Sequence, residues 1–298
     1  MKNNILFTGI MPALFTPLND DSTVNAKAVA PMMKWQMEQG VDGFYVLGGT
    51  GEGGVLEEKQ RMIMAEAAAD AVKGTDKKLI LHIGAADTRS AQRLAKHAAE
   101  VGADAISSVY PSFFSRYTVA EAKEYYRSLV EASGLPMLCY CNPMIQGNDA
   151  VHFAQTMMTV EGVIGLKYTM PNYYHMHLIK QINGGNINVI NGPDECLICG
   201  LSMGADGGIG TTYNMMPGWF VELYKAFRAN DIAKAQEMQF KINKVITVLI
   251  NNGTLPASKL AMEALGFEPG HAAFPAHRYT QEERAKIIAE LKEAGLLA

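Results

Sequence analysis

Residues 163–169 read VIGLKYT, a short apolar run that suits one β-strand and is too short for a typical helix. Seven further runs of this kind occur along the chain, separated by helical patterns that often end at a glycine. Strands that alternate with helices indicate parallel pairing through helical crossovers. The eight predicted strands are 7–15, 43–47, 78–83, 105–110, 137–141, 163–167, 186–191 and 207–211.

Eight strand–helix units fit a (β/α)8 TIM barrel, an α/β fold of roughly 250 residues. We expect a single domain over 1–298, with the barrel in 1–230 and additional C-terminal helices in 231–298. An open doubly wound sheet is the alternative, although it usually has fewer strands. The clearest helical patterns, the third with Asp87 or Thr88 as its cap, are 25–39, 57–72, 90–101, 231–251, 257–265 and 281–296.

The composition is that of an ordinary folded protein, with 19% charged residues and a net charge of −4. The absence of a basic stripe argues against nucleic acid as a partner. No apolar run reaches the ~18 residues of a membrane-spanning helix, so we expect no membrane partner. Residues 1–21 have the lysine and apolar stretch of a signal peptide, but Pro12 interrupts them and no cleavage site follows. We therefore expect a cytoplasmic protein.

Four cysteines are present: Cys139 and Cys141 in a predicted strand, and Cys196 and Cys199 in a C-x-x-C pattern. A metal site is one interpretation of this set. The other, which we favour, is that they are reduced thiols that pack as small apolar side chains. The seven histidines form no His-x-x-x-His pair.

Lys167 ends the sixth predicted strand, and the carboxyl ends of barrel strands form the working face of this fold. Removing an ammonium group from water favours the neutral amine. A neutral amine can attack a ketone and form a Schiff base. Alternation along the strand should place Val163, Gly165 and Lys167 on one face. The alternative is a surface lysine just beyond a strand.

Two further segments follow predicted strands. Tyr140 lies at the end of the fifth strand, next to Lys167 if both side chains point inward, where a phenol could move protons. Taken alone, Tyr140 fits the barrel core or wall better than a catalytic role. Residues 48–54, GGTGEGG, follow the second strand, and the Thr50 hydroxyl with nearby amides could hold a carboxylate. The alternative is a flexible turn.

Asp194 and Glu195 follow the seventh strand in NGPDE. They could bind substrate hydroxyls, or Asp194 could simply cap the next helix. The eighth strand and its exit, GADGGIGTTYN at 204–214, lack the full G-x-G-x-x-G pattern, which argues against a dinucleotide site.

Taken together, GGTGEG at 48–53, Tyr140, the Gly165–Leu166–Lys167 strand end and 204–214 resemble the pyruvate-dependent class I aldolases, the N-acetylneuraminate lyase and dihydrodipicolinate synthase family. The resemblance spans nearly the whole chain. It implies a (β/α)8 barrel with added C-terminal helices, usually a homotetramer. It also implies that Lys167 forms the Schiff base with pyruvate, that Tyr140 shuttles protons, and that Thr50 and Gly51 hold the pyruvate carboxylate.

Within this family the chain is most similar to the lyase branch. The resemblance implies that it cleaves N-acetylneuraminate, a sugar acid, into N-acetylmannosamine and pyruvate without metal or organic cofactor. The positions matching the sugar pocket of that branch are Thr169, Gly192, Asp194, Glu195 and Thr211. The alternatives are a 2-keto-3-deoxy sugar acid aldolase, a dihydrodipicolinate synthase-like enzyme, and a barrel that binds sugar acids without turnover.

The chain departs from the family at a few positions. Ile145 replaces the arginine that dihydrodipicolinate synthases have after the strand-five tyrosine, and Phe113 and Phe114 replace their interface tyrosine. Both departures argue against the synthase. Gly49 replaces a hydroxyl residue that usually precedes the threonine and relays protons. A water, Thr169 or a substrate hydroxyl could take that place.

Overall fold

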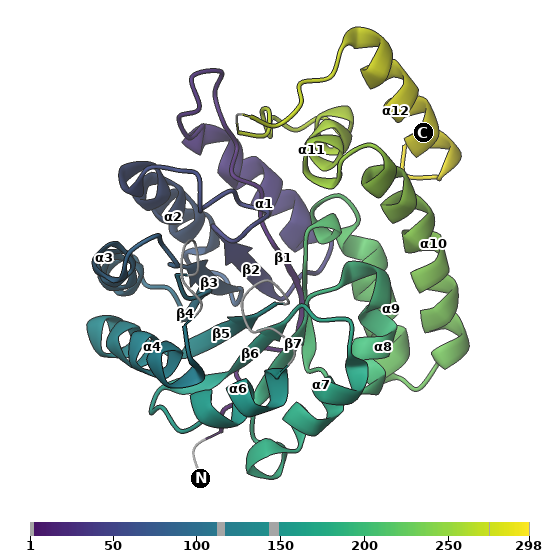
Figure 1. Cartoon of the computed structure of the whole chain (residues 1–298). Coiled ribbons are helices and arrows are strands. Elements are labelled where there is room, and N and C mark those ends of the chain that lie inside the picture. The colour runs from purple at the N-terminus through teal and green to yellow at the C-terminus, as the bar shows by residue number, and fades with distance from the viewer. Residues whose placement is uncertain (1–2, 112–116, 143–148, 274, 298) are drawn as a thin grey trace.

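Eight parallel strands form one curved sheet with helices outside it in the computed structural model, which describes residues 3–111, 117–142, 149–273 and 275–297 (Figure 1). Most predicted strands are slightly longer than the observed ones, because hydrogen-bonded pairing stops before the apolar run does. The strands are β1 (Gly9–Pro12), β2 (Gly43–Val46), β3 (Lys78–His82), β4 (Ala105–Ser108), β5 (Met137–Cys141), β6 (Val163–Tyr168), β7 (Asn188–Asn191) and β8 (Gly207–Gly210).

The strand order shows a barrel. It runs β1-β8-β7-β6-β5-β4-β3-β2, so the strands from β2 to β8 each pair with the next one in sequence, and β1 pairs with β8. A parallel bridge between Ala13 and Tyr45 joins the two remaining strands, and Leu14 N donates to Tyr45 O at 2.8 Å. The (β/α)8 barrel is therefore confirmed, and the open doubly wound alternative is wrong.

The helices surround this sheet, and the C-terminal ones lie together on one side of it (Figure 1). Local signals explain several ends: Asp87 caps its helix by accepting from Ser90 N, as predicted, and Thr118 forms a capping box with Glu121. The predicted helix 25–39 divides into a short 3-10 turn and an α-helix. The helices are η1 (Ala26–Ala28), α1 (Val29–Glu38), α2 (Glu58–Val72), α3 (Thr88–Glu100), α4 (Val119–Ser133), α6 (Ala150–Met157), α7 (Tyr173–Lys180), η2 (Ile182–Gly185), η3 (Asp194–Cys196), α8 (Leu197–Ser202), η4 (Thr212–Asn214), α9 (Pro217–Arg228), α10 (Ile232–Asn251), α11 (Thr254–Ala264) and α12 (Gln281–Glu293).

Two apolar layers hold the barrel together. A larger cluster fills the space between the sheet and the helices, and a smaller one fills the barrel interior. Strands buried on both faces read as continuous apolar runs, which is why the sequence pattern indicated a parallel sheet. The interior cluster consists of Phe7, Met11, Ala13, Tyr45, Ile80, Ala105, Leu138, Ile164, Ile190 and Ile209.

Strand β6 contains an irregularity that the sequence pattern did not predict. Met137 pairs with Val163, but the next residue, Leu138, pairs with Gly165, so Ile164 is an extra residue in β6. Such a bulge resets the alternation of side chains. Ile164 lies in the barrel interior and Val163 in the outer layer. The expectation that Val163 shares a face with Lys167 is therefore wrong.

Among the described residues, no helix combines the length and the apolar character needed to cross a lipid bilayer.

Candidate active site

The side chain of Lys167 lies inside the mouth of the barrel. Its partner across β5 and β6 is Tyr140, as the positions at the two strand ends suggested. Lys167 is only 5% exposed, so the interpretation as a surface lysine is wrong. Its Nζ lies 4.4 Å from the centroid of the Tyr140 ring and 4.3 Å from that of Tyr45. The amine is therefore enclosed by two aromatic rings at the carboxyl end of the sheet.

Two of the residues around this amine, Tyr45 and His82, were not among the predicted site residues. The Tyr45 hydroxyl donates to Ser107 Oγ at 3.0 Å, and burial raises the pKa of this phenol well above its usual value. The His82 ring stands at right angles to that of Tyr140, with centroids 6.3 Å apart. A signal for His82 was present in the sequence, because it is a polar residue at the carboxyl end of a barrel strand.

His82 is a neutral imidazole at ordinary pH. Burial, together with the positive charges of Arg61 and Lys167, lowers its pKa to about 3. The backbone N–H of Val109 donates to His82 Nε2 at 3.2 Å, which leaves the ring proton on Nδ1. His82 therefore adds a polar group beside the lysine without adding a charge.

The glycine-rich loop after β2 is anchored to the rest of the barrel mouth, which contradicts the interpretation as a flexible turn. A Cβ on Gly51 would lie 2.8 Å from Leu47 N and 3.0 Å from Leu14 O, so this close approach requires glycine. Thr16 Oγ1 donates to Gly51 O at 2.5 Å. Glu52 adopts a positive φ of 56°, an unusual conformation for a residue with a side chain.

A buried ion pair links this loop to the C-terminal helices. Lys259 of α11 approaches Glu52 to 2.6 Å, and their side chains are 2% and 5% exposed. Lys259 Nζ also donates to Thr16 O and His271 O, each at 2.9 Å. Burial lowers the pKa of Lys259, and the Glu52 carboxylate opposes that shift. The C-terminal helices thus contribute to the geometry of the barrel mouth.

The predicted pyruvate and sugar subsites meet at one contact. The hydroxyls of Thr50, in the glycine-rich loop, and Thr211, after β8, lie 2.7 Å apart. Gly49, next to Thr50, is exposed, and a Cβ there would meet no atom within 4 Å. There is consequently room at this position for the hydroxyl side chain that the chain lacks.

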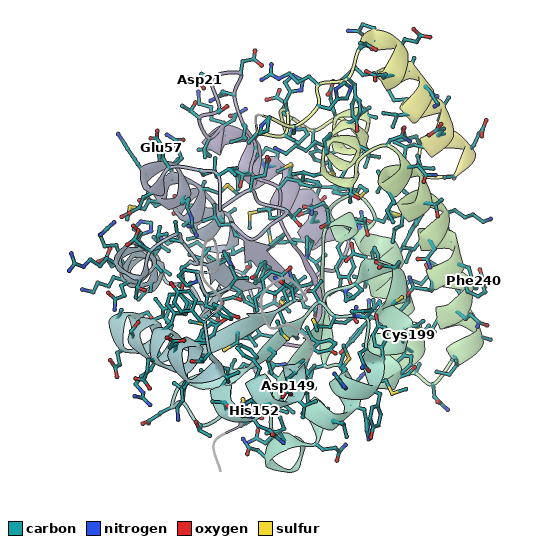
Figure 2. The ribbon with its side chains drawn as sticks, viewed as in Figure 1. Asp21, Glu57, Asp149, His152, Cys199 and Phe240 are labelled. Atoms are coloured by element: carbon teal, nitrogen blue, oxygen red, sulfur yellow. The ribbon has the colours of Figure 1, made fainter. Side chains whose placement is uncertain are left out.

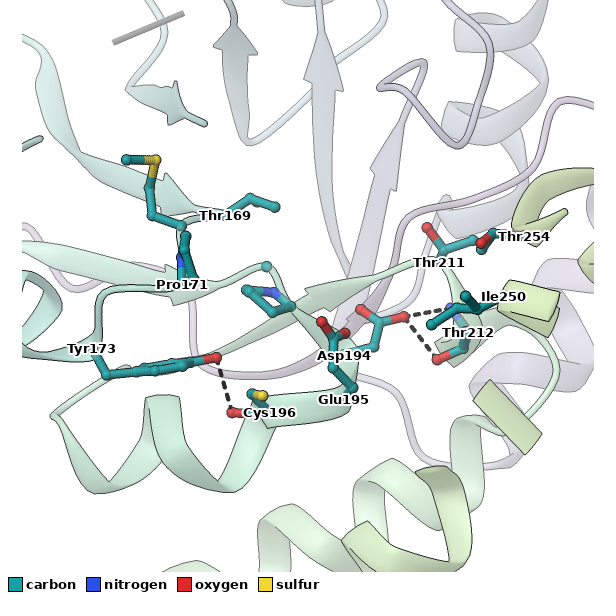
Figure 3. A pocket seen from close by; sticks show the side chains of 13 residues that line it. Thr169, Pro171, Tyr173, Asp194, Glu195, Cys196, Thr211, Thr212, Ile250 and Thr254 are labelled. Atoms are coloured by element: carbon teal, nitrogen blue, oxygen red, sulfur yellow. Dashed lines mark hydrogen bonds between the residues drawn. The ribbon is translucent and has the colours of Figure 1, made fainter. Parts of the chain in front are cut away.

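A cavity of about 460 Å³ opens beside this contact (Figure 3). The five residues predicted for the sugar pocket, Thr169, Gly192, Asp194, Glu195 and Thr211, all line it. Neither catalytic candidate is part of its lining, but Thr169 comes two residues after the lysine. Helices α10 and α11 complete the wall with Ile250 and Thr254, a contribution that the sequence did not reveal.

Asp194 is a buried acceptor and not a helix cap. The 3-10 turn η3 begins after Pro193 without a side-chain cap, so the capping interpretation is wrong. The Asp194 carboxylate accepts from Thr212 N and Thr212 Oγ1, each at 2.7 Å (Figure 3). Burial raises the pKa of Asp194 to about 6, although the Thr212 hydrogen bonds and the charge of Lys167 act in the opposite direction. The neighbouring Glu195 is exposed.

Thr169 places an unused hydroxyl in the cavity wall. Its Oγ1 is buried and has no hydrogen-bond partner among the described residues. A Cβ on Gly192 would lie 1.9 Å from this oxygen, so the hydroxyl needs glycine beside it. A buried hydroxyl without a partner is costly unless a ligand satisfies it.

The remaining predictions have different outcomes. Phe113, Phe114 and Ile145 lie outside the described residues. No group of three or more His, Cys, Asp or Glu side chains in the described ranges could hold a metal ion. Cys139 and Cys141 are buried in β5, whereas Cys196 and Cys199 follow β7.

Comparison with known proteins agrees with this geometry. The model of the dihydrodipicolinate synthetase family matches residues 6–294. The chain belongs to this family. Among curated relatives within it, N-acetylneuraminate lyase of Citrobacter koseri is 37% identical over 257 residues, 85% of each chain. N-acetylneuraminate lyase of Rhizobium meliloti is 34% identical over 288 residues, 96% of this chain and 93% of the relative.

Solved structures from the family have the same fold. N-acetylneuraminate lyase of Proteus mirabilis superposes with a TM-score of 0.92 at 30% identity, covering 98% of this chain and 99% of that one. The protein CdNal of Clostridium difficile, solved in complex with mannosamine, has a TM-score of 0.91 at 28% identity, and the match covers 97% of this chain and 99% of that one.

Proposed function

We propose that this chain is a Schiff-base aldolase that cleaves N-acetylneuraminate into N-acetylmannosamine and pyruvate. The observation that supports it most strongly is the enclosed side chain of Lys167. Lys167 pairs with Tyr140 on the neighbouring strand, and threonine hydroxyls line a cavity that begins two residues further along the chain, at Thr169. The lyase identity of the curated relatives points to the same activity.

In the proposed reaction, the Lys167 amine attacks the substrate ketone and water leaves, which forms an iminium. The Tyr140 hydroxyl assists removal of the proton from the C4 hydroxyl. The C3–C4 bond then breaks, and its electron pair moves toward the iminium nitrogen to give an enamine. N-acetylmannosamine departs, C3 is protonated, and hydrolysis of the iminium releases pyruvate. The lysine supplies the electron sink, so the step needs no metal or organic cofactor.

The other predicted residues bind the two ends of the substrate. Thr50 and the Gly51 amide hold the carboxylate, next to the lysine. Asp194, Glu195 and Thr211 accept or donate hydrogen bonds to the hydroxylated tail, and Thr169 supplies its partnerless hydroxyl. This assignment is supported by the contact between Thr50 and Thr211, which makes the two subsites continuous.

The experiment that tests the proposal traps the Schiff base. Borohydride added with pyruvate should give one stable adduct on the peptide containing Lys167, while Lys259, which is also buried, stays unmodified because Glu52 pairs with it. Lys167→Ala should bind substrate without turnover. An unmodified Lys167 peptide, or turnover in the variant, would refute the mechanism.

The substrate is tested separately by following pyruvate release from a panel of sugar acids. N-acetylneuraminate should give the highest kcat/KM. Preference for a 2-keto-3-deoxy sugar acid would identify the related aldolase, and condensation of pyruvate with an aldehyde to a dihydrodipicolinate precursor would identify the synthase. Binding of N-acetylneuraminate in calorimetry without pyruvate production would identify a non-catalytic binder.

We also propose that the enzyme is a single-domain homotetramer located in the cytoplasm, as the family resemblance and the sequence predict. Light scattering of the purified chain should give four times the subunit mass of 32.4 kDa. One cooperative unfolding transition should cover barrel and C-terminal helices, and cell fractionation should recover the activity with the cytosol.

A further inference from the structure

The C-x-x-C pair has no role in the proposed reaction, yet it adjoins the substrate pocket. Cys196 follows Glu195 directly and lines the cavity (Figure 3). Cys199 is exposed on α8 (Figure 2). One residue of the pair therefore belongs to the cavity wall, and the other is exposed to solvent.

The two cysteines stand together at the start of α8. Cys196 is the residue before the first residue of this helix, and Cys199 is the third residue within it. Residues three apart along one helical turn stand about 5 Å apart at Cα, within the range that a disulfide spans. The spacing therefore suits a bond between the two sulfurs.

The other two cysteines provide an internal contrast. Cys139 and Cys141 are both fully buried in β5. Burial raises the pKa of Cys141 to about 12 and that of Cys139 well above the usual value. Because the thiolate is the reactive form, these two should not react with a dissolved oxidant while the protein is folded.

We propose that Cys196 and Cys199 form a redox-reactive dithiol site in the wall of the cavity, which a small disulfide of the glutathione type converts into an intramolecular disulfide. The Cys199 thiolate attacks one sulfur of the oxidant and releases one thiolate. The Cys196 thiolate then attacks the Cys199 sulfur of the mixed disulfide and releases the second. The two thiol protons pass to the two released thiolates, so one disulfide is reduced as the other forms.

The site is coupled to substrate binding through Cys196; this part rests on the proposed function. The Tyr173 hydroxyl donates to Cys196 O at 3.3 Å, and Tyr173 also lines the cavity. Disulfide formation brings the two sulfurs to about 2 Å from each other and shifts Cys196, the residue that follows Glu195. We expect KM for N-acetylneuraminate to rise about fivefold, the effect of one neutral hydrogen bond, with pyruvate trapping on Lys167 unchanged.

The test incubates the full chain with defined ratios of reduced and oxidised glutathione. Peptide mass spectrometry should find a Cys196–Cys199 disulfide, reversible by reductant, with Cys139 and Cys141 still as thiols. Absence of this disulfide at every ratio, or a glutathione adduct that persists on Cys199, would overturn the proposal. The mass measurement needs no enzymatic activity. It therefore shows whether the disulfide forms even if the chain does not cleave sialic acid.

A single variant tests the coupling. Cys199→Ser alters an exposed residue outside the cavity and should keep the turnover of the reduced enzyme. It should lose the response of KM to oxidised glutathione that the original chain shows. An oxidised chain with the disulfide in place and an unchanged KM would overturn the coupling to the substrate pocket.

Discussion

Replacement of the buried Asp194 by asparagine should separate the stability of the fold from sugar binding. The pKa of Asp194 is about 6, against 3.8 for an unperturbed carboxyl. The folded chain therefore binds more protons than the unfolded chain between these values, and its free energy of unfolding falls as the pH rises from about 4 to 6. About two pKa units correspond to about 3 kcal/mol.

The variant Asp194→Asn should remove this dependence. Its amide oxygen can still accept from Thr212 N and Oγ1, but no charge is buried. At pH 8 we expect the variant to match or exceed the stability of the original chain, by up to about 3 kcal/mol. Glu195→Gln is the matched control, because it removes the same charge from an exposed neighbour and should leave the pH dependence intact.

The same variant should bind the sugar more weakly, although its fold is at least as stable. A carboxylate accepts hydrogen bonds from hydroxyls more strongly than an amide does, so the KM of Asp194→Asn for N-acetylneuraminate should rise roughly 10- to 100-fold. In the original chain kcat/KM should fall below about pH 6 as Asp194 is protonated. His82, with a pKa of about 3, stays neutral over this range and cannot cause the change.

The assays are urea unfolding at pH 4 to 8 and pyruvate release over the same range. Three results would refute the reasoning: equal pH dependence of unfolding in the original chain and Asp194→Asn, loss of that dependence in the control, or an acid limb of kcat/KM that survives in Asp194→Asn.

Further variants test other parts of the site. Tyr140→Phe should lower kcat by about 100-fold or more if its hydroxyl moves the proton, as pyruvate-release kinetics will show; near-normal turnover would make it a wall residue. Gly49→Ser should raise kcat by up to about tenfold by supplying a hydroxyl in open space, whereas Gly54→Ser, equally unobstructed, should not; equal kcat values would contradict this. Glu52→Gln should lower the free energy of unfolding by about 3–5 kcal/mol, because it leaves Lys259 buried without its carboxylate. In urea titrations, the double variant with Lys259→Met should recover part of this loss. No loss of stability in Glu52→Gln would mean that the ion pair does not hold the loop.

Much of the architecture could be predicted from local patterns. Short apolar runs indicate strands and a helical spacing of apolar residues indicates helices, and the alternation of the two leaves few topologies. Lys167 and Tyr140 could be placed at the same end of the barrel because parallel strands bring their carboxyl ends together. The five residues of the predicted sugar pocket all line one cavity, although they come from three separate strand ends.

Other features escaped the sequence because they depend on residues far apart in the chain. Lys259 bonds to Thr16 across 243 residues, and no local pattern predicts which buried cation meets which carbonyl. The acceptor role of Asp194 required knowing that Thr212 lies against it, since a helix cap has the same local sequence. The bulge at Ile164 depends on how β6 packs against β5, so alternation alone placed Val163 on the wrong face.

The pattern of apolar residues and the direction of the strands are local properties of the chain, so they are enough to predict the barrel and to place Lys167 beside Tyr140. The surroundings of that amine, the burial of Asp194 and the contact between the C-terminal helices and the glycine-rich loop depend on how the chain packs in three dimensions. Burial and electrostatic environment arise only when distant segments exclude water from one another, and they set the chemistry of each group.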